Sequence, residues 1–436
     1  MRRPYFYLPF LGCFFMFTWQ LSGGPIQMDV NAEAAILMNA ETGVVLFEKN
    51  SRHLRDPAST TKIATAIYFL HTKGSALDQV ATVSQEAMGV VSKAAKIKAG
   101  YKGANAHYLI PGSSHMGLKR GEEMSVRDLL YGTMLISGDD ASNVLAEQCS
   151  GNIPNFMQGL NGYLKEIGCT STTYHNPHGL YHPEHKTTAY DLAWMTREAL
   201  KNATFREIVS TVRYTLPQTN KKPSTVIIQT NRLIIPKSKG YYEKAIGVKT
   251  GYINESGHCL VAAAKQDSRT LIAVVMGCKE RAEIFAETKK MLEAAYAEVK
   301  EQKRLLKEGL QTLTMSFEGG REPLQTYLKS DVVVEYYPAE MPEFSAKLHW
   351  KELALPVAKD QEVGEIELVD TTGTQIIHIP LLAFNEVRPT FWMGIKIFCT
   401  EFGVVRLAIS ALVCVGVLSL VAYFFFSRRR KLRPST

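Results

Sequence analysis

Asp56-Pro57-Ala58-Ser59-Thr60-Thr61-Lys62 is the stretch from which the fold and the chemistry of this sequence are inferred. Asp56 and Pro57 suit the start of a helix, so a buried helix is predicted over 59–72. The i, i+3 spacing places Ser59 and Lys62 on one helix face. A serine hydroxyl needs a base beside it, and lysine is such a base when burial or positive charge lowers its pKa. The stretch therefore suggests an activated serine, although S-x-x-K alone also fits an ordinary solvated helix.

A second motif, Ser137-Gly138-Asp139, lies between helical patterns at 125–135 and 141–148. Side chains at such a junction can point into a cleft, where Ser137 would relay a proton between the nucleophile and the leaving amine. The alternative is a helix-capping turn, because Ser, Gly and Asp all favour caps.

A third motif, Lys249-Thr250-Gly251, belongs to a predicted strand. Lys249 offers a positive charge and Thr250 a hydroxyl, and both suit a carboxylate terminus. Gly251 leaves room for the backbone of a substrate. The alternative is a Lys and a Thr on an exposed strand edge.

The order of these three motifs is similar to the signature of penicillin-binding proteins and class A β-lactamases. Longer stretches extend the resemblance, namely 56–62, 129–132, 137–141, 176–180, 188–192, 230–233, 247–252 and 355–368. Over residues 30–388 the chain resembles a low-molecular-mass penicillin-binding protein of the D-alanyl-D-alanine carboxypeptidase family, a group of serine D,D-peptidases.

The resemblance implies an α/β catalytic domain of the serine β-lactamase/transpeptidase type, with helices on both sides of an antiparallel sheet. It implies that Ser59 attacks the carbonyl between two D-Ala residues of a peptidoglycan stem peptide, with Lys62 as base. Ser137 and Lys249 would pass the proton to the departing D-Ala, and water would hydrolyse the acyl-enzyme. β-Lactams would acylate Ser59 as substrate mimics.

The resemblance also assigns substrate binding to Asp139, Thr250, Gly251, Tyr252 and Arg281. Thr250 and Arg281 would hold the terminal carboxylate, and the N–H groups of Ser59 and Tyr252 would form the oxyanion hole. His178 and Asp191 fall in a matching stretch and are interpreted as structural loop residues.

The sequence departs from the family pattern at Asp139, where the family usually has Asn. Ionised Asp only accepts hydrogen bonds, and an anion near Lys62 raises the pKa of that lysine. The segment 93–111 also looks longer than usual near the cleft. A third departure is the hydrophobic C-terminal anchor, because many relatives use an amphipathic helix.

The pattern of apolar residues divides the body of the chain. Residues 34–48 are predicted to form a hairpin, and strand-like runs follow at 257–265 and 270–277. A helical stripe at 281–296 closes a catalytic domain assigned to 30–297. Short alternating runs over 304–388 predict a small all-β, sandwich-like domain with a spacing or interaction role.

Both ends of the chain carry targeting signals. Residues 1–24 read as a secretory signal peptide, with an uncleaved anchor as the alternative. The segment 389–402 is expected at the membrane interface. Residues 407–426 lack charge and are predicted to be a transmembrane helix, followed by a basic cytoplasmic tail at 427–436. The body is therefore expected on the periplasmic side of a bacterial inner membrane.

Charge and cysteine content limit which binding partners, metal sites and disulfides are expected. Seven of the 50 Lys and Arg residues lie at Arg2, Arg3 and in the cluster 428–433, and the other 43 nearly balance 42 Asp and Glu. Nucleic acid is therefore not an expected partner. The motifs indicate no cofactor and no metal site. Cys149 and Cys169 are the most plausible disulfide in the body, and free buried thiols are the equal alternative.

Three other functions remain open on the sequence. A D,D-endopeptidase would cut peptide cross-links with the same serine. A β-lactamase is disfavoured, because no E-x-x-L-N motif lies between the second and third motifs. A catalytically weak scaffold that binds wall peptides is supported only by Asp139.

Overall fold

The computed structural model describes residues 24–370, 373 and 375–430, without the side chains of 399, 401–407 and 425–430. The chain forms two compact units. The N-terminal unit contains the described residues up to Glu301 together with Tyr336–Met341. The C-terminal unit contains Gln302–Glu335 and the chain from Pro342 onward. Almost all of the predicted signal peptide 1–24, and the end of the basic tail from 431, lie outside the described residues.

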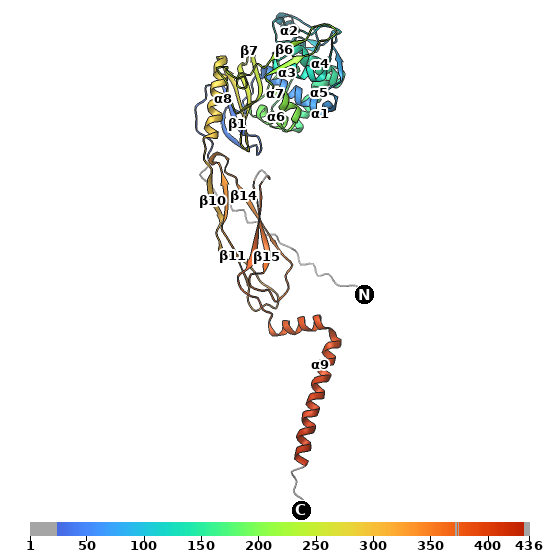
Figure 1. The fold of residues 1–436 in the computed structure, drawn as a ribbon, viewed down its shortest axis with the longest axis vertical. Helices are drawn as coiled ribbons and strands as arrows, with labels where there is room; N and C mark the ends of the chain where they lie inside the picture. The colour runs from blue at the N-terminus through green and yellow to red at the C-terminus, as the bar shows by residue number, and fades with distance from the viewer. Residues whose placement is uncertain (1–23, 371–372, 374, 431–436) are drawn as a thin grey trace, which may run out of the picture. The chain divides into compact units, whose positions relative to one another are not determined.

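A five-stranded antiparallel sheet forms the centre of the N-terminal unit, in the order β2-β1-β9-β8-β7 (Figure 1). Its strands are β1 (Ala34–Asn39), β2 (Val45–Lys49), β7 (Ala245–Ile253), β8 (Gly257–Gln266) and β9 (Arg269–Cys278). The predicted hairpin at 34–48 is β1 and β2, which pair antiparallel with a bulge between Leu37 and Met38. β7 is an edge strand, and this places the Lys249 motif at the free edge of the sheet.

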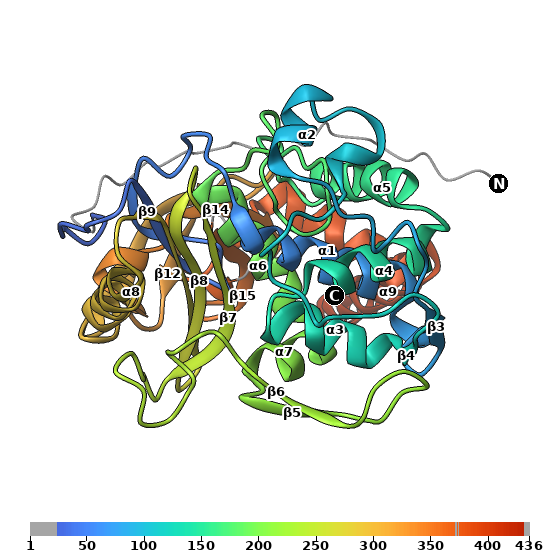
Figure 2. The ribbon, with the colours of Figure 1, turned by 90° about the horizontal axis from the view of Figure 1, so that it is seen from above.

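Side chains alternate between the two faces of the sheet, because successive strand residues point in opposite directions. Leu37, Leu260 and Val275 pack with α8 (Arg281–Tyr296) on one face. Met38, Val261 and Val274 pack with the helical layer on the other face. Figure 2 shows α8 on one side of the strands and the other helices of this unit on the opposite side.

The helical layer and its connections carry the first two motifs. Its helices are α1 (Lys62–Lys73), α3 (Val126–Leu135), α4 (Asp139–Ser150), α5 (Ile153–Glu166), α6 (Ala189–Lys201) and α7 (Ala203–Ser210). Two-stranded ribbons are formed by β3 (Val80–Thr82) with β4 (Glu123–Ser125) and by β5 (Arg213–Leu216) with β6 (Thr225–Ile228). The segment 93–111 contains the short helix α2 (Lys93–Lys98) and a 3-10 turn at Gly103–Ala106.

The C-terminal unit is built from strands, followed by one long helix. A five-stranded sheet has the order β11-β12-β16-β15-β14. Its strands are β11 (Gly309–Met315), β12 (Leu324–Leu328), β14 (Phe344–Trp350), β15 (Glu362–Asp370) and β16 (Ile376–Ala383), and β10 (Glu301–Leu306) pairs with β13 (Val332–Tyr336). Leu324, Val363 and Leu381 form part of its core.

The last helix, α9 (Phe391–Arg430), covers the predicted interfacial segment and the predicted span. Within the described residues, no helix reaches the length and apolar character that crossing a membrane requires. The predicted span 407–426 includes three positions, 407, 425 and 426, whose side chains the structure does not describe. The transmembrane helix therefore stays a prediction.

The proposed disulfide between Cys149 and Cys169 is wrong. Both are free and buried, as are Cys259 and Cys278. Cys169 Sγ instead donates a hydrogen bond to the Asp191 carbonyl at 3.4 Å. Burial raises the pKa of all four thiols, which disfavours the thiolate needed for oxidation.

Candidate active site

The nucleophile motif is held by a 3-10 turn (Ala58–Thr61) that leads directly into α1. Ala58 has a φ of +48°, so the helix begins at Lys62 rather than at Ser59. The prediction that Asp56 caps this helix is wrong, because its carboxylate accepts two 2.8 Å hydrogen bonds from Lys186 Nζ. The turn still places Ser59 and Lys62 together, with Lys62 Nζ donating to Ser59 Oγ at 3.0 Å.

Lys62 is fully buried, and its ammonium group uses all three of its donors. Besides Ser59, it donates to Asp139 Oδ1 at 2.6 Å and to the His178 carbonyl at 2.7 Å. Burial lowers the pKa of Lys62, and the negative charge of Asp139 partly opposes this shift. The lysine is thus fixed in orientation toward the serine and moved toward its basic form.

Asp139 is the first residue of α4, where the helix dipole favours a negative charge. Its side chain is 3% exposed and forms a buried ion pair with Lys62. Burial raises the pKa of the Asp139 carboxyl, and the Lys62 ammonium opposes this effect. The structure therefore places Asp139, the residue that departs from the family pattern, in direct contact with Lys62, the predicted base.

Ser137 lies beside this pair in an unusual backbone conformation, with a φ of +66°. Its buried Oγ has no hydrogen-bond partner among the described residues. The motif does form the capping turn of α4, because Gly138 occupies the cap position, but Ser137 itself supplies no side-chain cap for this helix. A strained residue with an unused hydroxyl is typical of a functional position.

Lys249 is fully buried in β7, which excludes the alternative of an exposed strand edge for this side chain. Burial and the nearby charge of Lys62 lower the pKa of Lys249 well below its usual range. Its Nζ donates to the Thr250 carbonyl at 2.9 Å. A second lysine with a depressed pKa therefore lies near the first one.

A cleft brings together most of the predicted site residues. It is lined by Ser59, Ser137, Asp139, Thr250, Gly251, Tyr252 and Arg281, among others. Lys62 and Lys249 lie buried beside it. A Cβ added at Gly251 would lie 3.1 Å from the Ser59 nitrogen, so this glycine allows β7 to pass close to the nucleophile.

The carboxylate-binding candidates come from three separate segments. Thr250 Oγ1 lies 2.9 Å from Thr230 Oγ1, and Arg281 donates to the Thr230 carbonyl at 3.4 Å. Tyr252 is 53% exposed and stacks on His258 with a centroid distance of 4.3 Å. These groups form a polar wall at the free edge of β7.

Sequence reasoning missed Lys96 on α2. It is 2% exposed and lines the cleft, yet its Nζ has no hydrogen-bond partner in the part of the chain that the structure describes. Burial lowers the pKa of Lys96 to about 8. No local sequence pattern predicts that Lys96 is buried, because Lys93 and Lys98 on the same short helix are exposed.

His178 also contributes more than its sequence context indicated. Its carbonyl accepts the hydrogen bond from Lys62, while its buried ring is hydrogen bonded to the His107 carbonyl at 2.9 Å. Asp191 accepts from the Ser171 amide and from Thr172 Oγ1, which suits the structural role predicted for it.

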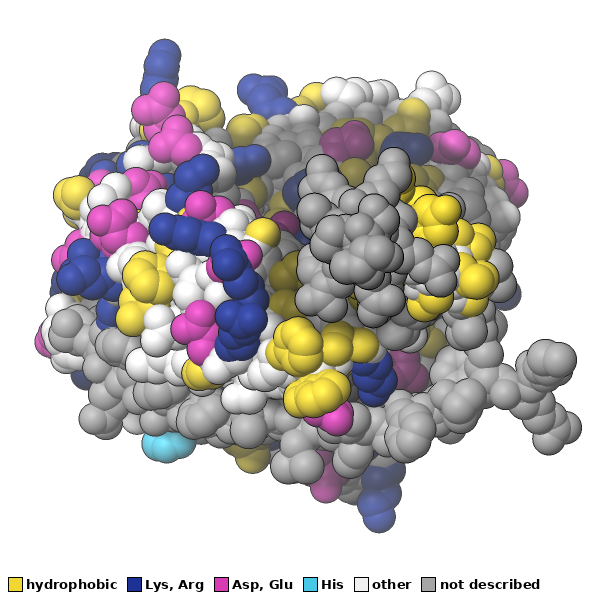
Figure 3. Space-filling view, turned by 90° about the horizontal axis from the view of Figure 1, so that it is seen from below, with side chains coloured by type: hydrophobic (Ala, Val, Ile, Leu, Met, Phe, Trp, Pro, Cys, Tyr) yellow, Lys and Arg dark blue, Asp and Glu magenta, His cyan; other side chains and the backbone are white. Residues whose placement is uncertain are grey.

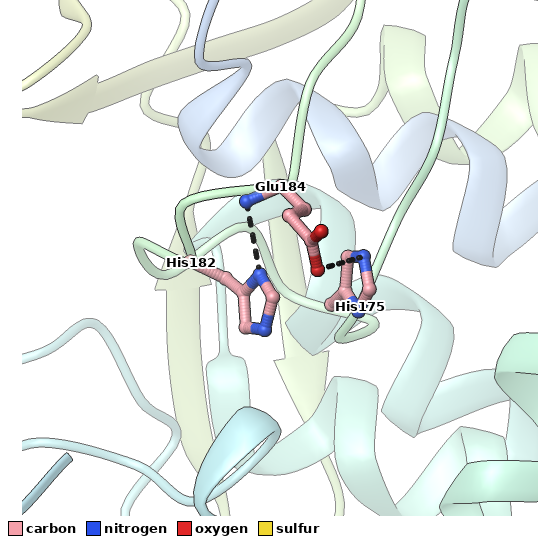
Figure 4. A group of neighbouring side chains, drawn as sticks. All are labelled: His175, His182 and Glu184. Carbon is pink, nitrogen blue, oxygen red and sulfur yellow. Dashed lines mark hydrogen bonds and ion pairs between the residues drawn. The ribbon is translucent and has the colours of Figure 1, made fainter. Parts of the chain in front are cut away.

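His175, His182 and Glu184 form a further cluster in the same loop, with ligand-type atoms within 4.8 Å of one another (Figure 4). His182 Nδ1 accepts the Glu184 amide at 3.1 Å. Burial and His175 lower the pKa of His182 to about 4, so the ring is neutral at pH 7 and carries its proton on Nε2. The lone pair on His182 Nδ1 already accepts the Glu184 amide, so it is not available to a metal ion. Hydrogen bonding within the loop explains why these three side chains lie together.

The sequence as a whole is similar to one family of known proteins. A sequence model of the D-alanyl-D-alanine carboxypeptidases matches residues 22–280. The chain belongs to the D-alanyl-D-alanine carboxypeptidase family. It is a serine peptidase of this family, and the resemblance inferred from the three motifs is confirmed.

The sequence similarity between this carboxypeptidase and its relatives extends beyond the catalytic unit. It is 32% identical to D-alanyl-D-alanine carboxypeptidase DacF of Bacillus subtilis, over 82% of this chain and 86% of the relative. It is 31% identical to DacD of Salmonella typhimurium, over 84% and 89%. Penicillin binding protein 5 of Haemophilus influenzae has a similar structure, with a TM-score of 0.56, 26% identity and coverage of 84% and 100%. The mixed α/β fold predicted from the sequence is thereby confirmed.

Proposed function

We propose that Ser59 attacks the carbonyl carbon between two D-Ala residues at the end of a peptidoglycan stem peptide, with Lys62 as general base. The 3.0 Å contact from Lys62 Nζ to Ser59 Oγ is the observation that carries this proposal. A neutral lysine at that distance takes the hydroxyl proton as the bond to carbon forms. Membership of the carboxypeptidase family supports the substrate class.

Ser137 and Lys249 would return the proton to the departing D-Ala. The Oγ of Ser137 is free to accept a hydrogen bond from one group and donate one to another, since it has no partner within the described residues. The depressed pKa of Lys249 suits a residue that gives up its proton more readily than an ordinary lysine does. Water would then hydrolyse the ester on Ser59 and release the shortened peptide.

Substrate would lie along the free edge of β7, as an added strand does in other peptide-binding proteins. Thr250 and Arg281 would bind the terminal carboxylate, because a hydroxyl and a guanidinium both donate to it. The N–H groups of Ser59 and Tyr252 would stabilise the oxyanion. Gly251 supports this arrangement by permitting the close approach of β7 to Ser59.

Labelled penicillin and a pentapeptide ending in D-Ala-D-Ala test this function on the full chain in detergent. We expect covalent labelling and release of D-Ala, with both lost in Ser59→Ala and unchanged in Ser210→Ala, which alters an exposed serine. A folded wild-type protein that shows neither reaction would refute the proposal. A cross-linked peptide dimer in the same assay measures the D,D-endopeptidase alternative.

We also propose that the chain is anchored in a bacterial inner membrane by its C-terminal segment, with the catalytic unit on the periplasmic side. The uncharged sequence 407–426 and the basic cluster that follows it support this orientation. Exposed Phe391 and Trp392, at 69% and 78%, suit an interfacial position. Figure 3 shows apolar side chains, in yellow, exposed on the face seen from below. If the full-length chain, with residues 389–436 present, is recovered in the soluble fraction of cells, this membrane location is contradicted.

A further inference from the structure

The cleft contains a buried positive charge that the proposed reaction does not use. Lys96 lies on α2 within the segment 93–111, and Figure 2 shows α2 at the margin of the helical layer. Its side chain is 2% exposed, and its residue lines the same cleft as Ser59. The ammonium nitrogen is itself shielded from solvent and makes no hydrogen bond with any residue that the structure describes.

A buried ammonium without a partner destabilises a folded protein, because it loses water without gaining a counter-ion. The pKa of Lys96 is lowered to about 8 by burial, so the group is still charged at pH 7. Asp139 is the acidic group that acts on it electrostatically, but the Asp139 carboxylate is paired with Lys62. His107, His178 and His182, which also lie near, offer no negative charge. The missing partner is therefore an anion that enters the cleft.

The chemistry of the substrate indicates which anion this is. In the proposed reaction the leaving D-Ala has one carboxylate, and Thr250 and Arg281 hold it. These residues come from β7 and α8, whereas Lys96 comes from α2, where its carbonyl accepts a hydrogen bond from the Tyr101 amide at 3.0 Å. Tyr101 and residues 179–181 line the same cleft. A second anion must then belong to the part of the substrate that stays on Ser59.

We propose that Lys96 forms an anion subsite that binds a carboxylate on the acyl side of the scissile bond, so that the enzyme prefers donors with a negative charge there. Lys96 is a specificity-determining residue in this scheme, and Ser59 and Lys62 perform the chemistry. The inference rests on the proposed function for its orientation. It goes beyond that function by naming a feature of the substrate.

Two penicillins that differ by one carboxylate on the acyl side chain, benzylpenicillin and its α-carboxy derivative carbenicillin, test the subsite. The second-order rate of Ser59 acylation is measured for each with the full chain. We expect the ratio of carbenicillin to benzylpenicillin rates to fall roughly tenfold to a hundredfold in Lys96→Met, the value of a charge-assisted hydrogen bond. Lys98→Met, an exposed lysine on the same helix, is expected to keep the wild-type ratio. An unchanged ratio in Lys96→Met would overturn the proposal.

Equilibrium binding separates this inference from the proposed function. Calorimetry with Ser59→Ala measures binding of acetyl-X-D-Ala-D-Ala peptides in which X carries a side-chain carboxylate or the matching amide. Tighter binding of the carboxylate peptide, lost when Lys96→Met is added, supports the subsite even if no D-Ala is released by the wild type. Equal affinities for the two peptides refute the subsite, while D-Ala release by the wild type still supports the reaction.

Discussion

Lys62 Nζ lies 2.6 Å from Asp139 Oδ1 and 3.0 Å from Ser59 Oγ, so the lysine that we propose as the base contacts a buried carboxylate and the proposed nucleophile at once. The carboxylate has two opposite effects. It holds the lysine in a fixed orientation, and it stabilises the protonated form that cannot act as base. A neutral amide at this position would keep the first effect and remove most of the second.

Asp139→Asn is expected to move the acidic limb of the pH profile for penicillin acylation to lower pH. Removing the anion lowers the pKa of Lys62 further, so its basic form persists at more acidic pH. A shift of about 1 to 3 pH units is expected from the loss of one close opposite charge. Asp78→Asn, at a side chain 89% exposed, is the control and should leave the profile in place. A limb that stays fixed or moves to higher pH in Asp139→Asn would contradict this account of the base.

Ser137→Ala is expected to slow acylation by roughly 10²–10⁴-fold, because the proton relay to the leaving group is lost. The thermal stability of this variant should stay close to that of the wild type, since Ser137 Oγ makes no hydrogen bond with the described part of the chain. Stopped-flow acylation and calorimetric melting measure the two quantities. A large fall in Tm with normal acylation would instead assign Ser137 a structural role.

Gly179→Ala is expected to destabilise the catalytic unit by about 3 kcal/mol or more. Gly179 has a φ of +92°, and a Cβ there would lie 1.8 Å from the Ala58 carbonyl oxygen, next to the nucleophile. Gly162→Ala, within α5 and with no atom near the added carbon, should be neutral or stabilising. Urea unfolding of both variants measures the difference, and equal effects at the two positions would contradict the packing described for Gly179.

The parts of the site that short spacing controls were predictable from the sequence. Ser59 and Lys62 are three residues apart, and the order of the motifs indicated Ser137 and Lys249. The start of α1 was predicted at the wrong residue, because Asp56 pairs with Lys186, 130 positions away. Local preferences do not contain such long-range pairs.

The burial of Lys96 was even less predictable from local sequence. Its neighbours Lys93 and Lys98 are exposed, and a Lys-rich segment normally is solvated. Burial of Lys96 depends on loops that contact α2 only in the folded chain. The Cys149–Cys169 hypothesis failed for a related reason, since compartment and count permit a disulfide but cannot place two sulfur atoms together.

Lys96→Met is expected to stabilise the protein at pH 7 by roughly 2–3 kcal/mol, since it replaces an unpaired buried charge with an apolar side chain of similar length. The sign follows from the lowered pKa of Lys96. The charged form is disfavoured in the folded state, so the cost is fully present below pH 8 and declines as the pH rises from about 8 toward the usual value of 10.5. Urea unfolding at pH 7 and pH 10 should therefore show a gap between Lys96→Met and wild type that narrows at the higher pH. A variant less stable than wild type at pH 7 would show that Lys96 has a partner within the folded chain. Lys96→Met should also lose the proposed preference for substrates that carry a carboxylate on the acyl side. The variant would then be more stable than the wild type but less selective for its substrate.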